Sequence, residues 1–175
     1  MQFLKEKSKI EAWLNKYKIT PYTLLADEQY GFVVNVAGHV DLSDKQLKEI
    51  PVKFNIVNGF FYCFDNQLIN LEFCPKTVGG DFNCVYNQLT SLEFCPKTVN
   101  GGFLCKNNQL TSLEFCPETV SGIFYCFDNQ LLGHIQEIDD FTTIYLEHKK
   151  WHAENLYDKL DTKLISKGLS SRVKI

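Results

Sequence analysis

Seven cysteines are the most conspicuous reactive residues of this 175-residue chain. Their spacing alternates between 11 and 10 residues, so none of them forms the C-x-x-C pair that is typical of zinc or redox sites. Four follow a phenylalanine by two positions, which places them on the same side of an extended segment, and we predict that they pack as small hydrophobic side chains. The other three precede proline at a turn, where we expect more exposure. The first group is Cys63, Cys84, Cys105 and Cys126, and the second is Cys74, Cys95 and Cys116.

Two histidines near the C-terminus have the spacing of a metal-binding pair. His148 and His152 are four residues apart, but the sequence between them reads HKKWH and lacks the glutamate of an H-E-x-x-H zinc site. We predict that they lie on a solvated helix face and that the chain binds no metal. No nucleophile elbow, phosphate loop or pair of facing carboxylates is recognisable, and Gly79–Gly80 is interpreted as a turn. The sequence therefore predicts no catalytic residue, no enzymatic activity and no cofactor.

The elements that position these side chains are set by an internal repeat. The sequence CPKTVGGDFNCVYNQLTSLEF, which begins at Cys74, returns with small changes at Cys95 and Cys116, a period of 21 residues. A fixed period in the twenties is typical of stacked structural units that cannot bury their apolar faces alone. The repeated columns include Phe61, Phe82, Phe103 and Phe124; Asn66, Asn87, Asn108 and Asn129; and Leu68, Leu89, Leu110 and Leu131.

Each unit is predicted to form one coil of a solenoid. The alternation of Phe82 and Cys84 indicates a short strand whose two apolar residues point inward. Gly79 and Gly80 lead into this strand, Pro75 marks a turn on the opposite side, and the rest of the unit returns as extended chain. Successive strands would stack in parallel about 4.8 Å apart. The other apolar columns of the unit are Val78, Leu89, Leu92 and Phe94.

The repeated asparagine follows the inward cysteine by three residues, at the turn that leaves the strand. An unpaired buried amide costs on the order of 1–3 kcal/mol, so an asparagine repeated at one buried position implies that its hydrogen bonds are satisfied each time. We predict a ladder in which each amide bonds backbone groups of its own coil and of the adjacent coil.

The segments before and after the repeats differ in pattern. Apolar residues at helical spacing predict a helix over 3–18 that ends before Pro21, and the run 30–36 predicts a strand that pairs with a neighbouring segment. The repeat begins in degenerate form at Val40, which falls under Phe61 when the sequence is shifted by 21 residues, and Lys45 takes the asparagine position.

At the other end, residues 143–146 predict a last strand and residues 149–167 predict a helix that covers the open end of the stack. We therefore predict three parts: an N-terminal helix-and-strand cap at 1–39, a solenoid at 40–146, and a C-terminal capping helix and tail at 147–175.

The F-x-C-x-x-N-Q-L sequence followed by L-x-x-L-E resembles the leucine-rich repeat, L-x-x-L-x-L-x-x-N-x-L. The Pro75–Val78 spacing is similar to the short bacterial class, and VDLSDKQLKEIP after an N-terminal helix is similar to small repeat proteins of bacteria and their phages. The resemblance covers about residues 40–146 and departs from the family in using Phe and Cys where Leu and Val are commoner. It implies an α/β solenoid, a right-handed stack of about six coils with a parallel strand face. It also implies that the chain binds proteins and that the strand face is concave.

On that analogy the residues that alternate with the inward Phe and Cys face a partner. Several of them are aromatic or leucine in positions that should meet water, which often marks an interface. Two alternatives remain open: this face forms a homodimer, or a segment of the chain itself covers it. The predicted partner-binding residues are Phe60, Tyr62, Phe64, Asn83, Val85, Leu104, Lys106, Tyr125 and Phe127.

Charge and hydropathy narrow the class of partner. The net charge is −3, and residues 51–131 hold seven acidic residues against four lysines, so no basic stripe for nucleic acid is present. No signal peptide and no apolar run of membrane-spanning length is recognisable, so we expect a cytoplasmic protein with reduced thiols. The resemblance to phage proteins suggests an inhibitor of a host or defence protein. A repeat-guided enzyme such as a ubiquitin ligase would need a catalytic domain for which about 30 residues after the repeats do not suffice.

Overall fold

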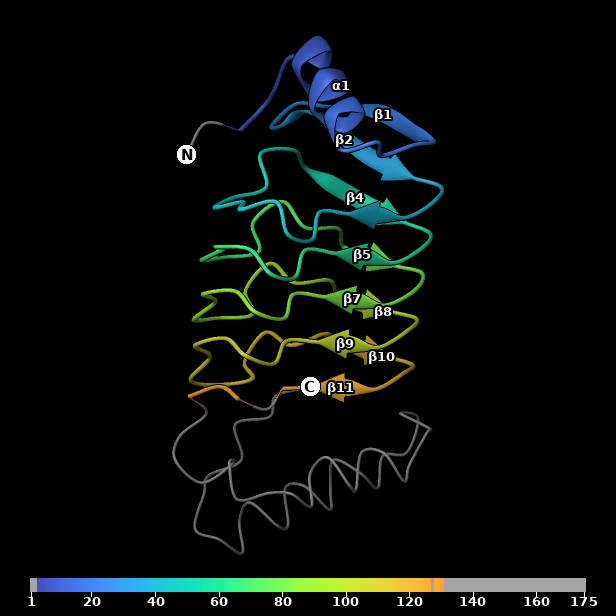
Figure 1. Cartoon of the computed structure of the whole chain (residues 1–175). Coiled ribbons are helices and arrows are strands. Elements are labelled where there is room, and N and C mark those ends of the chain that lie inside the picture. Colours follow the sequence, from blue (N-terminus) through green and yellow to red (C-terminus); the bar gives the residue numbers. More distant parts are fainter. Residues whose placement is uncertain (1–2, 127, 131–175) are drawn as a thin grey trace, which may run out of the picture.

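The 21-residue repeat folds into a β-solenoid, a stack of coils whose short strands run parallel (Figure 1). The computed structural model describes residues 3–126 and 128–130. Within that part, four successive coils carry two strands each, and we number them coil 1 (from residue 54), coil 2 (from 75), coil 3 (from 96) and coil 4 (from 117). The strand pairs are β4 (Phe54–Val57) with β5 (Phe61–Tyr62), β6 (Thr77–Val78) with β7 (Phe82–Asn83), β8 (Thr98–Val99) with β9 (Phe103–Leu104), and β10 (Thr119–Val120) with β11 (Phe124–Tyr125).

The strands form two sheets, which run along the stack. One has the order β1-β2-β4-β6-β8-β10 and the other β11-β9-β7-β5-β3, and neighbouring coils pair with an offset of 21 residues, as in Phe61 with Phe82 and Val57 with Val78. The sequence predicted one strand in each coil, so the sheet that contains β6, β8 and β10 was missed. Strands β6, β8 and β10 contain only two residues each, and their hydrogen-bond partners are supplied by the adjacent coils, so the local sequence carries little strand signal.

The corner between the two strands of a coil has glycine at one repeated position, namely Gly59, Gly80, Gly101 and Gly122. A Cβ atom on Gly101 would lie 2.6 Å from the Gly80 carbonyl carbon of the preceding coil, and one on Gly122 would lie 2.7 Å from that of Gly101. This glycine therefore permits the close approach of coils, and in coil 2 the pair Gly79–Gly80 separates two strands instead of leading into a single one.

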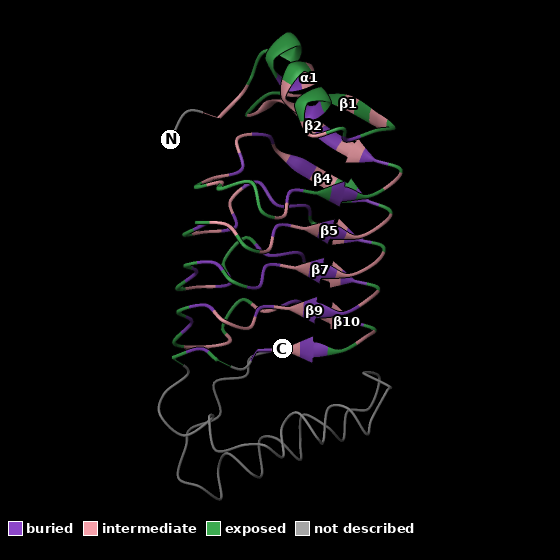
Figure 2. Cartoon of the chain, in the orientation of Figure 1, coloured by how far each residue is buried: buried purple, intermediate pink, exposed green. Residues whose placement is uncertain are grey.

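The interior is filled by the columns that the repeat predicts (Figure 2). The Phe61 and Phe82 rings are stacked with centroids 5.7 Å apart, and the Phe82 and Phe103 rings with centroids 5.4 Å apart. The predicted burial of the cysteines that follow these phenylalanines is confirmed. Phe94, in contrast, was assigned to the interior and is 52% exposed, because its left-handed backbone (φ 68°) turns the side chain outward.

The asparagine ladder is also confirmed. The Asn87 Oδ1 atom accepts the Leu68 N–H at 2.9 Å, and its Nδ2 donates to the carbonyl oxygens of Cys63 at 2.9 Å and Cys84 at 3.1 Å. Each amide therefore joins its own coil to the one before it, and it satisfies backbone groups that the turn leaves unpaired. The same arrangement recurs at Asn66, Asn108 and Asn129.

The N-terminal elements lie at one end of the stack (Figure 1). Helix α1 (Lys7–Lys16) is shorter than the predicted 3–18, since residues 3–5 are extended and the helix ends well before Pro21. The predicted strand is β2 (Gly31–Val36), which forms an antiparallel hairpin with β1 (Tyr22–Asp27) and pairs in parallel with β4. Strand β3 (Val40–Asp41) pairs with β5 in the predicted register, Val40 opposite Phe61.

Several predictions fall on residues that the structure does not describe. They are the strand at 143–146, the helix over 149–167, the His148 and His152 pair, and Leu131 of the leucine column. The three-part division at residues 39 and 146 stays a prediction. Among the described residues, no helix has the length and apolar character that crossing a membrane requires.

Candidate interaction surface

The predicted partner-binding residues lie on the outer face of the β3-β5-β7-β9-β11 sheet. In each of these strands the phenylalanine or valine points inward and the next residue points outward, because successive side chains of a strand alternate between faces. We call this surface the strand face. The residues it presents change from coil to coil, unlike those of the interior.

Coil 1 and the turn before β3 give the strand face a line of aromatic side chains, which we call the aromatic row: His39, which precedes β3, and Phe60, Tyr62 and Phe64 of coil 1. The Phe60 ring stacks on His39 with centroids 4.1 Å apart and on Tyr62 at the same distance, and Tyr62 is tilted against Phe64 at 5.9 Å. Phe60, Tyr62 and Phe64 are each half-buried, so the rings hold one another while part of each remains open to solvent. Rings that already pack together lose little conformational freedom on binding.

The sequence analysis missed His39, which belongs to the aromatic row. Its Nδ1 atom accepts the Phe60 N–H at 3.1 Å, and this bond together with the ring stacking fixes both side chains. A signal was present, since His39 lies 21 residues before Phe60. The predicted repeat begins at Val40, one residue after His39, so His39 was left out of the predicted strand face.

Two carboxylates flank the aromatic row. Burial, and then the nearby Asp81 and Asp41 carboxylates, raise the pKa of the Tyr62 hydroxyl above its usual range. The Asp81 Oδ1 atom accepts the Gly102 N–H at 2.6 Å, and the Asp41 Oδ1 atom accepts the Ser43 N–H at 3.0 Å. Both carboxylates are therefore held by backbone bonds, and Tyr62 lies between them as a protonated hydrogen-bond donor at neutral pH.

The remaining predicted residues are farther along the strand face. Val85 is buried, and its N–H bonds the Asn83 Oδ1 atom at 3.1 Å, so this pair stabilises the coil locally. Leu104 and Lys106 are half-buried in coil 3. Tyr125 is also half-buried but lies three coils from Tyr62, which at the usual strand spacing is about 14 Å. Phe127 is outside the described residues. The structure thus brings together three of the nine predicted residues in the aromatic row.

Five of the buried cysteines, namely Cys63, Cys84, Cys95, Cys105 and Cys126, are held as neutral thiols. Burial raises the pKa of Cys84, Cys95 and Cys105 well above the ordinary value, and it raises the pKa of Cys126 to about 12. For Cys63, a side-chain hydrogen bond with Cys74 and then burial raise the pKa. A neutral buried thiol is neither nucleophilic nor a good metal ligand. The part of the chain that the structure describes holds no cluster of three or more residues suited to a metal ion.

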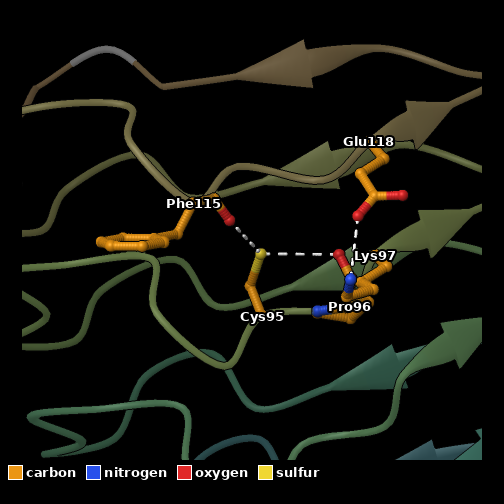
Figure 3. A network of polar contacts seen from close by, with 5 residues as sticks. All are labelled: Cys95, Pro96, Lys97, Phe115 and Glu118. Carbon is orange, nitrogen blue, oxygen red and sulfur yellow. Dashed lines mark hydrogen bonds and ion pairs between the residues drawn. The ribbon is translucent and has the colours of Figure 1, made fainter. Parts of the chain in front are cut away.

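The expected exposure of the proline-flanking cysteines is wrong for two of the three. Cys74 and Cys95 are buried, and only Cys116 is partly exposed. The Cys95 thiol donates to the Phe115 carbonyl oxygen at 3.1 Å in the next coil (Figure 3). Next to it, on the surface, Lys97 of coil 3 pairs with Glu118 of coil 4 at 3.0 Å. The turn that contains Cys95 is therefore part of the contact between coils.

No protein-family model matches this chain, and no curated protein or solved structure does. The function must accordingly be inferred from the residues and their geometry.

Proposed function

We propose that the chain is a non-enzymatic protein-interaction module that binds a partner protein through the strand face, with the aromatic row at the centre of the contact. The observation that carries the proposal is the stacking of His39, Phe60 and Tyr62 on one outward face. Aromatic side chains in contact with solvent supply large apolar area at low entropic cost, and such residues dominate the binding energy of protein interfaces.

The surroundings of the aromatic row support a protein partner rather than nucleic acid. Asp41 and Asp81 place negative charge beside Tyr62, which disfavours a phosphate backbone. The same carboxylates are suited to hydrogen bonds from the backbone or from basic side chains of a partner, at the edge of an apolar contact.

We also propose a specific type of solenoid and the elements that cap its two ends. We take the chain to be a right-handed stack of the leucine-rich repeat type, an α/β solenoid in which α1 and the β1–β2 hairpin cap one end and the C-terminal helix caps the other. The resemblance to small repeat proteins of phages supports a sharper version, a cytoplasmic inhibitor that occupies the surface of a host or defence protein.

The experiment is affinity purification with mass spectrometry from cells that naturally produce the chain. The wild type is compared with Tyr62→Ser/Phe64→Ser, and with a control variant, Ile69→Ser/Tyr86→Ser, which removes two apolar side chains that are more exposed and lie away from the strand face. We expect a partner that the wild type and the control capture and that the strand-face variant loses. Equal capture by all three proteins would contradict the proposal.

Light scattering on the same three proteins separates the alternative of self-association. A wild type and control that are dimers, with a monomeric strand-face variant, would assign the aromatic row to a second copy of the chain. A monomeric wild type that still captures its partner supports the interaction module.

A further inference from the structure

The phenylalanine that ends each L-E-F sequence lies in two different environments. Phe73 of coil 1 is 3% exposed, whereas Phe94 of coil 2 and Phe115 of coil 3 are 52% and 55% exposed. All three have a left-handed backbone, with φ of 71°, 68° and 65°. A bulky residue in this conformation costs roughly 1–3 kcal/mol. Contacts within the chain compensate for that cost at Phe73, but the exposed rings of Phe94 and Phe115 have no comparable compensation.

The chain's own N-terminal segment covers Phe73. The Phe3 ring lies with its centroid 5.0 Å from that of Phe73, and Tyr30 packs against both rings at 5.8 Å. The next residue, Leu4, donates its N–H to the Pro51 carbonyl oxygen at 2.8 Å. An extended segment therefore binds here by one aromatic side chain and one backbone hydrogen bond. We call this pair of features a slot: the outward phenylalanine and the carbonyl oxygen 22 positions before it.

The same slot recurs in the next two coils, where none of the described residues fills it. The slot of coil 2 consists of Phe94 and the carbonyl oxygen of Glu72. The slot of coil 3 consists of Phe115 and the carbonyl oxygen of Glu93. Within residues 3–126 and 128–130, neither of these carbonyl oxygens accepts a hydrogen bond. At Phe115 the backbone is held by the Cys95 thiol, which bonds its carbonyl oxygen while the ring extends to the other side (Figure 3).

The charge around the open slots indicates which side chains a bound segment would carry. The residue before each outward phenylalanine is acidic, namely Glu72, Glu93 and Glu114. In the filled slot, Lys5 follows Phe3 by two positions and places its Nζ atom 4.9 Å from the centroid of the Phe3 ring. Glu93 and Glu114 are exposed beside the slots of coils 2 and 3, so they would attract a basic residue of a bound segment.

We propose that Phe94 and Phe115 form a second interaction surface, which binds an extended segment of a partner protein that carries an aromatic residue followed two positions later by a lysine or arginine. The aromatic side chain packs on Phe94 or Phe115, the following N–H donates to the carbonyl oxygen of Glu72 or Glu93, and the basic side chain faces the glutamates. This surface is distinct from the strand face and does not depend on the function proposed for it.

The chain supplies its own probe for this surface. A fluorophore-labelled peptide with the sequence of residues 2–7, QFLKEK, is titrated with the full-length protein by fluorescence anisotropy, up to about 1 mM, the weak end of specific recognition. We expect saturable binding by the wild type, and binding at least about tenfold weaker by Phe94→Asn/Phe115→Asn, because asparagine keeps the left-handed backbone but removes the rings. A peptide with alanine in place of phenylalanine should not bind.

The matched control is Tyr86→Asn, which also removes an exposed aromatic ring from a left-handed position (φ 52°) on a different turn. It should bind the peptide as the wild type does. Absence of saturable binding to the wild type, or equal binding by Phe94→Asn/Phe115→Asn, would overturn the proposal. Dimerisation of the full chain that only Phe94→Asn/Phe115→Asn abolishes would also overturn it, since the slots would then belong to a second copy.

Discussion

Coils 1 and 3 have the same interior and different exteriors. Inside, both have phenylalanine, cysteine, asparagine and leucine at matching positions, from Phe61 to Leu68 in one and from Phe103 to Leu110 in the other. Outside, on the strand face, coil 1 presents Phe60, Tyr62 and Phe64 where coil 3 presents Gly102, Leu104 and Lys106.

The comparison shows which residues specify the fold and which are free to specify a partner. An inward residue contacts its equivalents in the coils on both sides, so a change in one coil disturbs three. An outward residue makes fewer such contacts and can differ between coils without loss of register.

Phe82→Ala should cause the largest loss of stability. The ring stacks on Phe61 and Phe103 in the adjacent coils, and removing a fully buried phenylalanine typically lowers the free energy of unfolding by about 3–5 kcal/mol. Phe64→Ala, on the strand face, is the matched control and should cost less than about half as much. Urea denaturation followed by circular dichroism measures both, and equal losses would contradict the division.

Asn87→Ala should lower the free energy of unfolding by about 1–3 kcal/mol, because it leaves the Leu68 N–H without its partner and removes one of the two amide donors of each of the Cys63 and Cys84 carbonyl oxygens. The control is Asn83→Ala, which removes one local bond to the Val85 N–H and should cost about 0.5–1 kcal/mol. If the two variants have the same urea midpoint, the amide ladder does not hold adjacent coils together.

Alkaline pH should weaken the stack through its buried thiols. A cysteine in the unfolded chain loses its proton near pH 8.5, whereas burial raises the pKa of Cys126 to about 12 and raises that of Cys105 well above the ordinary value. Above about pH 9 the unfolded state therefore binds fewer protons than the folded state, and stability falls by up to about 1.4 kcal/mol per pH unit for each thiol.

The control for the pH effect is Cys105→Ala. Its free energy of unfolding should be lower than that of the wild type near pH 7, and it should decline less steeply between pH 9 and pH 11 in urea titrations. A variant with the wild-type slope would show that this thiol does not contribute to the alkaline loss.

Phe94→Gly should have the smallest effect and the opposite sign. Glycine adopts the left-handed backbone at no steric cost, so the variant should gain roughly 0.5–1 kcal/mol in the free energy of unfolding. The same substitution at Phe73 should destabilise the protein, since it removes the contacts with Phe3 and Tyr30. Thermal denaturation of the pair measures the difference, and a loss of stability at both positions would argue that the exposed ring packs within its own chain.

Much of the interior could be predicted from the sequence because each inward residue type recurs several times at intervals of 21 residues. The phenylalanine stack, the buried thiols of the F-x-C segments, the asparagine ladder and the register of β3 against β5 all followed from the 21-residue period. The second sheet did not, because Thr77–Val78 is too short to show a strand pattern and depends on bonds from other coils.

The direction of side chains at turns was the other feature that could not be predicted from the sequence. Leu92 and Phe94 have the same apolar character in the sequence, but the left-handed backbone at Phe94 reverses the direction of its side chain. A similar limit applies to Cys95, whose burial depends on the turn of the following coil. On the strand face, the column positions were predictable, whereas the stacking of Phe60 between His39 and Tyr62 depends on rotamers that no spacing determines.

The central claim is that the outward residues of coil 1, and not the repeat as such, determine binding. The most direct measurement is partner capture by Tyr62→Leu/Phe64→Lys, which gives coil 1 two of the three outward residues of coil 3. It is compared with the reciprocal variant Leu104→Tyr/Lys106→Phe, which leaves coil 1 intact. We predict that the first variant folds with a urea midpoint close to that of the wild type and loses the partner, while the second keeps it. Retention of the partner by a folded Tyr62→Leu/Phe64→Lys protein would contradict the account.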